Sequence, residues 1–188
     1  MVGILGVGNR LSKVTEQCAS LYQVLLDFEG VVTKENAAIG RSDLAELEEI
    51  TDDKIIFGEK VKREIRALKE AMDHLAVELG DDSHHSNEDH QISQFVAAIR
   101  EKVLASHPQF DLELKRMEVW AQKLKDLRLQ IFAKVETNAY LVKRLLEYHR
   151  ETYAFWQSVA RESEAVYGQS GKTKYGSSPQ KSILNVRT

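Results

Sequence analysis

The sequence predicts an all-α protein: an elongated antiparallel helical bundle or coiled coil of three to four helices, with a long C-terminal helix and a disordered tail. Three observations support this class. Only two prolines and ten glycines interrupt 188 residues, so the backbone can remain helical over long stretches. Apolar residues recur at steps of three and four, which is the period of one helix face. Hydrophobic residues make up 43% of the chain, enough for the core of one domain.

The first half of the chain predicts two long helices after a flexible N-terminus at residues 1–10. Apolar residues keep the helical period from residue 11 to 39, and Gly40 fits a C-terminal cap. Asp43 and Glu46 then resemble a capping box that opens a second helical run, which extends to Leu79. Residues 11–79 therefore form either two antiparallel helices or one continuous bent helix.

A polar connector and a proline divide the second half. Residues 80–90 read GDDSHHSNEDH and predict a solvated connector. A shorter helix from Ile92 through Val103 should end before His107 and Pro108, because the residue preceding proline is disfavoured in helical conformation. Asp111 can cap a last helix that continues to Tyr167, so the helical domain spans residues 11–167.

The last helix changes character along its length. Its first half carries an ordinary core stripe within about 140° of arc: Trp120, Leu124, Leu127, Ile131, Phe132 and Val135. In its second half the apolar residues spread over about 180°, which is wider than one helix neighbour needs. Either the protein's own helices cover this half, or it accepts an amphipathic helix from a partner, with Phe155 and Trp156 as anchors. Residues 168–188 are rich in glycine, serine and lysine and predict a flexible tail.

Charge and cysteine content narrow the class of protein. A net charge of −3 and a pI of about 6.1 give no field that attracts nucleic acid or an anionic membrane. The single cysteine, Cys18, has no partner for an internal disulfide, which favours a reducing compartment. The opening stretch MVGILGVGNR is too short for a secretory signal and lacks a basic leader, and no apolar run reaches about 18 residues, so we expect a cytoplasmic protein.

No motif predicts an enzyme, a cofactor or a metal. The SGKT stretch at Gly171, Lys172 and Thr173 lacks the first glycine, the strand and the helix of a phosphate-binding loop. The connector's histidines and acids lack the spacing and rigid support of a specific metal site. We therefore expect no catalytic residues, no cofactor and no functional metal site.

Residues 25–54, LLDFEGVVTKENAAIGRSDLAELEEITDDK, resemble the N-terminal part of FlgN-type flagellar export chaperones. The resemblance rests on a leucine pair, spaced acids, an aspartate-leucine helix start and a spaced lysine. The residues that carry it are Leu25, Leu26, Glu29, Glu35, Ala37, Asp43, Leu44, Leu47 and Lys54. In the second half, Asn138, Leu141, Leu145 and Leu146 in NAYLVKRLL, and Tyr167 and Gly168 in VYGQSG, look like the family's late helix and its ending. Ala38 and Ile39 depart from the alanine-leucine pair that the family tends to have there.

The resemblance implies a chaperone that binds the C-terminal helical segments of hook-filament junction proteins and delivers them to the flagellar type III export gate and its ATPase. The expected cargo-binding residues are Asn138, Leu141, Val142, Leu145, Tyr148, Thr152, Phe155, Trp156 and Val159. Tyr167 and Gly168 are the expected contact with the export gate. The alternative is a structural coiled-coil protein without cargo that uses the same face on itself, as a homodimer.

Overall fold

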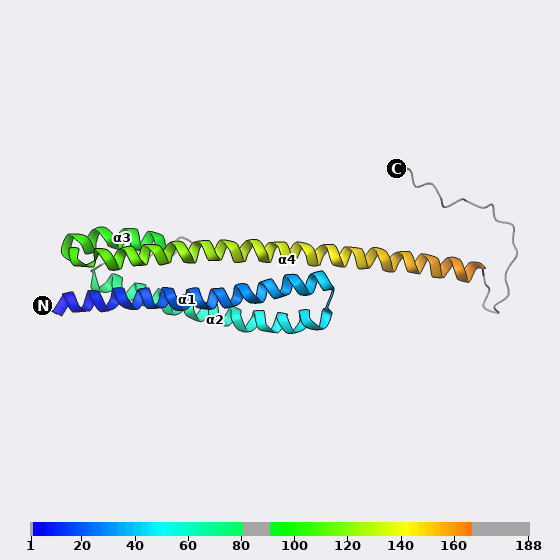
Figure 1. The fold of residues 1–188 in the computed structure, drawn as a ribbon, viewed down its shortest axis with the longest axis horizontal. Helices are drawn as coiled ribbons and strands as arrows, with labels where there is room; N and C mark the ends of the chain where they lie inside the picture. The colour runs from blue at the N-terminus through cyan, green and yellow to red at the C-terminus, as the bar shows by residue number, and fades with distance from the viewer. Residues whose placement is uncertain (1, 81–90, 167–188) are drawn as a thin grey trace, which may run out of the picture. The chain divides into compact units, whose positions relative to one another are not determined.

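A computed structural model describes residues 2–80 and 91–166, and every regular element in them is helical. The elements are α1 (Val2–Arg41), α2 (Leu44–Glu78), α3 (Gln91–Ser106), the 3-10 turn η1 (Pro108–Phe110) and α4 (Asp111–Val166) (Figure 1). The predicted all-α class with a long last helix is thereby confirmed. The predicted connector lies outside the described residues except for Gly80, and the predicted tail lies wholly outside them.

The chain divides into two compact units. Unit 1 is Met1–Leu141 and contains α1, α2, α3 and the first part of α4. Unit 2 is Val142–Thr188, and its described part is the remainder of α4.

α1 and α2 form an antiparallel pair, which rules out the alternative of one bent helix. Contacts between the two helices pair residues whose numbers rise in one helix as they fall in the other: Glu35 with Lys54, and Ser20 with Glu64. Ser42 makes the reversal with a φ of 56°, and the carboxylate of Asp43 accepts a hydrogen bond from the backbone N–H of Glu46 at 3.1 Å. The predicted cap at Asp43 is confirmed.

The predicted cap at Gly40 is wrong, because α1 continues to Arg41. The backbone N–H groups of Ser42 and Asp43 donate to the carbonyls of Ile39 and Ala38, at 3.0 and 3.1 Å. These bonds close the helix end after Arg41, and the left-handed residue is a serine where glycine is usual. Ala38 and Ile39 are both buried, so packing fixes the place of the turn.

Residues 1–10 were predicted to be a flexible N-terminus, whereas in the structure α1 begins at Val2. Val7 and Leu11 are buried and extend the stripe of Val14 and Cys18 backward by whole helical steps. A Cβ on Gly8 would lie 3.1 Å from Cε1 of Phe110, so the glycine allows close packing against η1. Gly8 thus lets α1 and η1 pack closely together.

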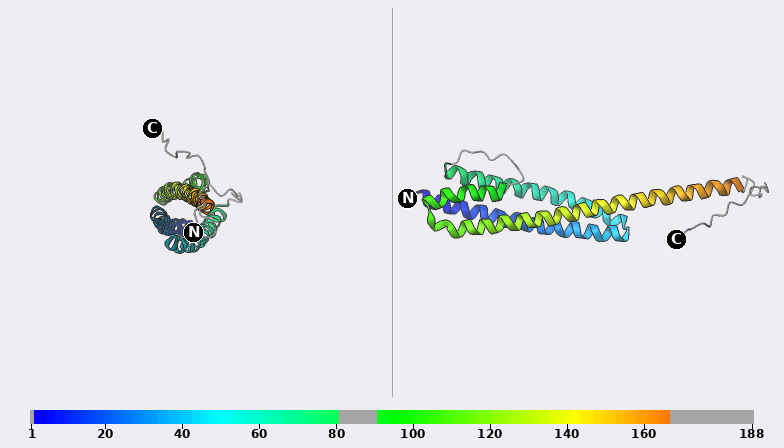
Figure 2. Two further views of the ribbon diagram at one scale, coloured as in Figure 1. Left: turned by 90° about the vertical axis from the view of Figure 1, so that its right-hand side faces the viewer. Right: turned by 90° about the horizontal axis from the view of Figure 1, so that it is seen from above.

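The main core of unit 1 lies where all four helices meet (Figure 2). Its buried side chains come from the first half of α1, the last third of α2, all of α3 and the start of α4. They are Val7, Leu11, Val14, Cys18, Leu21, Leu68, Ala71, Met72, Leu75, Phe95, Val96, Ile99, Val103, Leu114, Met117 and Leu124. Because α3 has 16 residues against 40 in α1, it cannot follow the α1–α2 pair to its turn. A smaller cluster of Val31, Ala38 and Ile50 packs near that turn.

α3 ends at Ser106, as the proline predicts, and is tied to α4 by ion pairs. His107 has an extended φ of −143° before Pro108. The guanidinium of Arg100 on α3 pairs with the carboxylates of Glu118 and Asp111 on α4. Asp111 is the first residue of α4, and its carboxylate also accepts from Lys115 at 2.6 Å.

The first half of α4 buries a stripe close to the predicted one. Leu124, Leu127 and Ile131 are buried, as expected. Phe132 is 59% exposed, so its predicted place in the core is wrong. Phe132 lay at the edge of the predicted arc, where the sequence period cannot tell a core position from a surface position.

Candidate functional site

The part of α4 in unit 2 presents an apolar face that is largely exposed. Tyr148, Phe155 and Trp156 are 64%, 59% and 62% exposed, and Val159 is 38% exposed. Val142, Leu145 and Thr152 are half-buried. At about 100° per residue these side chains occupy one half of the helix. Seven of the nine predicted cargo-binding residues therefore share this face.

The aromatic anchors of the face contact each other. The rings of Phe155 and Trp156 lie edge to face with centroids 5.6 Å apart, and Tyr148 and His149 do the same at 5.9 Å. Such contacts favour particular rotamers of these exposed rings. On the opposite half of the helix, Arg144 and Glu147 form an ion pair at 3.1 Å.

Two large residues of the face were not among the predicted binding residues. Leu146 and Tyr153 are 64% and 66% exposed. They lie at the edge of the apolar half, next to Val142, whereas the prediction favoured the centre and the opposite edge. We define the apolar face of unit 2 as Val142, Leu145, Leu146, Tyr148, Thr152, Tyr153, Phe155, Trp156 and Val159.

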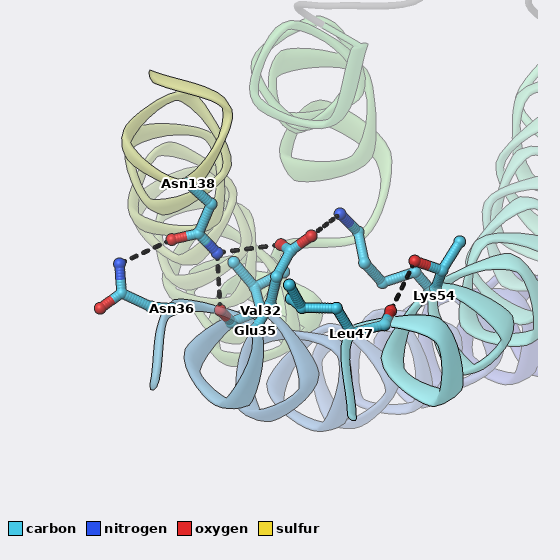
Figure 3. Close-up of polar contacts among 7 residues, drawn as sticks. Val32, Glu35, Asn36, Leu47, Lys54 and Asn138 are labelled. Atoms are coloured by element: carbon cyan, nitrogen blue, oxygen red, sulfur yellow. Dashed lines mark hydrogen bonds and ion pairs between the residues drawn. The ribbon is translucent and has the colours of Figure 1, made fainter. Parts of the chain in front are cut away.

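The structure places Asn138 and Leu141 in unit 1 rather than on this face. Asn138 is only 2% exposed, and its side chain is engaged by three backbone or side-chain partners on α1 (Figure 3). Its amide nitrogen donates to the carbonyl of Val32 and to a carboxylate oxygen of Glu35, each at 2.9 Å. Its amide oxygen accepts from Asn36 at 2.7 Å. Leu141 is half-buried.

The same polar cluster reaches α2 through Glu35. The other carboxylate oxygen of Glu35 accepts from Nζ of Lys54 at 2.8 Å, so one carboxylate bridges α4 and α2 (Figure 3). One turn earlier on α4, Nζ of Lys134 donates to Glu29 and Thr33 of α1, at 2.7 and 2.9 Å. The residues that carry the resemblance in sequence, Glu29, Glu35, Lys54 and Asn138, thus join three helices near the α1–α2 turn.

The described residues hold no cluster of side chains suited to binding a metal ion. No group of three metal-ligating side chains occurs there, and the connector's histidines lie outside that part. Burial raises the pKa of the Cys18 thiol to about 12, which makes it a poor nucleophile. A hydrogen bond from Lys115 lowers the pKa of Asp111, and a hydrogen bond from Lys62 lowers the pKa of exposed Glu59.

None of the described helices combines the length and the apolar character needed to cross a bilayer. Tyr167 and Gly168, the predicted contact with the export gate, fall outside the described residues.

A family model described as FlgN protein matches residues 8–175. No match was found among curated proteins or among solved structures. The matched range covers most of α1 and all of α2, α3 and α4, with the polar cluster and the apolar face, and FlgN is a family of chaperones rather than of enzymes. The chain therefore belongs to the FlgN family of flagellar chaperones.

Proposed function

We propose that the chain is a cytoplasmic chaperone of flagellar type III export, which binds the C-terminal helical segments of hook-filament junction proteins on the apolar face of unit 2. The family supports the general role. One observation supports placing the binding site on this face. Four aromatic side chains there are 59% to 66% exposed: Tyr148, Tyr153, Phe155 and Trp156.

The exposed aromatic area is of the size that a partner would use. A buried aromatic side chain covers roughly 150–250 Å², so four rings exposed by about three fifths offer roughly 500 Å². A standard interface buries roughly 800 Å² on each partner. With Leu146 and the half-buried members included, the apolar face can supply most of such an interface.

The binding mode follows from the shape of the face. A convex helix surface offers apolar side chains at steps of three and four, and an amphipathic helical segment fits it with the same spacing. A segment that is unstructured when free would lose conformational entropy as it folds on the face, which lowers the net affinity. Moderate affinity suits a cargo that must be released for export, and binding keeps its apolar residues from pairing with other copies.

Delivery to the export gate and its ATPase is the part of the proposal that rests on the family alone. Tyr167 and Gly168 follow directly after α4 and are the proposed gate contact. Cargo binding by apolar contact requires no catalytic residue, cofactor or metal, and we propose that the chain is not an enzyme.

The experiment compares two double variants on the same helix. Phe155→Ala with Trp156→Ala removes two anchors of the apolar face. Leu129→Ala with Phe132→Ala, at 58% and 59% exposure in unit 1, is the matched control. Isothermal titration with a junction protein's C-terminal segment should show affinity lowered about a hundredfold by the first pair and unchanged by the second. Equal affinity for wild type and a still helical Phe155, Trp156 variant would contradict the proposal.

Light scattering addresses the coiled-coil alternative. A chaperone whose face is open to cargo should be monomeric when free and form a complex with the segment. A tight dimer that the Phe155, Trp156 variant dissociates, together with no uptake of the segment, would favour a protein that uses the face on itself.

A further inference from the structure

We draw no further inference here: the strongest candidate, the exposed apolar face of unit 2 on the last part of α4, belongs to the site already described, and nothing in the structure shows what covers it.

Discussion

Asn138 is a polar residue in the interior of unit 1, and its amide is fully used there. It hydrogen-bonds a backbone carbonyl, a carboxylate and a second amide on α1. The carboxylate, that of Glu35, also accepts a hydrogen bond from Lys54 on α2. A buried amide that fits only one set of partners disfavours every other alignment of the helices, because a shift leaves its groups without hydrogen bonds. Asn138 therefore fixes the register of α4 against α1.

Asn138→Ala should lower the free energy of unfolding by about 1–3 kcal/mol, since Glu35 and the carbonyl of Val32 lose a donor in a partly buried site. Urea denaturation measures the loss. Thr137→Ala is the control, because Thr137 is exposed and its hydroxyl bonds only the carbonyl of Ala133 on its own helix. We expect the control to change stability by less than about 0.5 kcal/mol. Equal losses in the two variants would refute the register role.

Cys18 makes the unfolding free energy of unit 1 depend on pH in the alkaline range. Its pKa rises from 9.0 to about 12 because burial disfavours the thiolate. The folded state thus keeps the proton between these values while the unfolded state releases it. The stabilisation is complete below pH 9 and is lost as the pH rises toward 12, by about 1.4 kcal/mol per pH unit.

Cys18→Ala removes this contribution. Between pH 8 and pH 10 wild type should lose about 1.4 kcal/mol more unfolding free energy than the variant. Urea denaturation at the two pH values gives both losses, and comparison within each protein cancels the cavity that the substitution leaves. Parallel losses would show that the thiol titrates alike in both states.

At the scale of elements, two adjacent residues form the α1–α2 turn, one through its backbone conformation and the other through its side chain. Ser42 supplies the left-handed conformation, and Asp43 satisfies the backbone N–H of Glu46 at the start of α2. Arg41 and Glu46 form an ion pair across the turn. The antiparallel pair and the polar cluster near its end both require this reversal.

Asp43→Ala should destabilise unit 1 by about 1 kcal/mol, because the first turn of α2 loses its cap. Asp43→Asn keeps an oxygen acceptor and should stay within about 0.5 kcal/mol of wild type. Thermal unfolding followed by circular dichroism distinguishes the two. If both variants lose the same stability, the charge of Asp43 matters and the hydrogen bond does not.

At the scale of the whole molecule, the buried core and the proposed binding face lie in different units. Every buried side chain of the described residues lies between Val7 and Asn138, and so belongs to unit 1. The apolar face lies in unit 2. The two tryptophans divide in the same way: Trp120 packs on Tyr22 in unit 1, and Trp156 is exposed in unit 2.

Removal of residues 142–188 should therefore change the unfolding free energy of unit 1 by less than about 1 kcal/mol and abolish binding of the junction-protein segment. Fluorescence of Trp120 follows urea denaturation in both proteins once Trp156→Phe is made in the full chain. A truncated chain that fails to fold would show that unit 2 contributes to the core.

In the full chain with Trp120→Phe, emission reports on Trp156 alone. It should shift to shorter wavelength when the segment binds, because the ring leaves water. An unchanged spectrum with bound segment would place the contact elsewhere.

The sequence by itself determined the helices and most of their limits. Proline at 108, the capping pair at Asp43 and Glu46, and the steps of three and four depend on local backbone chemistry, which nearby residues decide. The half-apolar character of late α4 and the resemblance to the FlgN family were equally visible, since both are properties of residue order.

Only the tertiary structure decided which apolar faces are covered. Periodicity shows that residues share a side of a helix but does not show what lies opposite, so Phe132 was expected in the core and is exposed. The same limit applies to Asn138, whose partners on α1 lie 102 to 106 residues earlier in the chain. Such contacts arise from packing between distant segments, and this packing leaves Phe155 and Trp156 exposed.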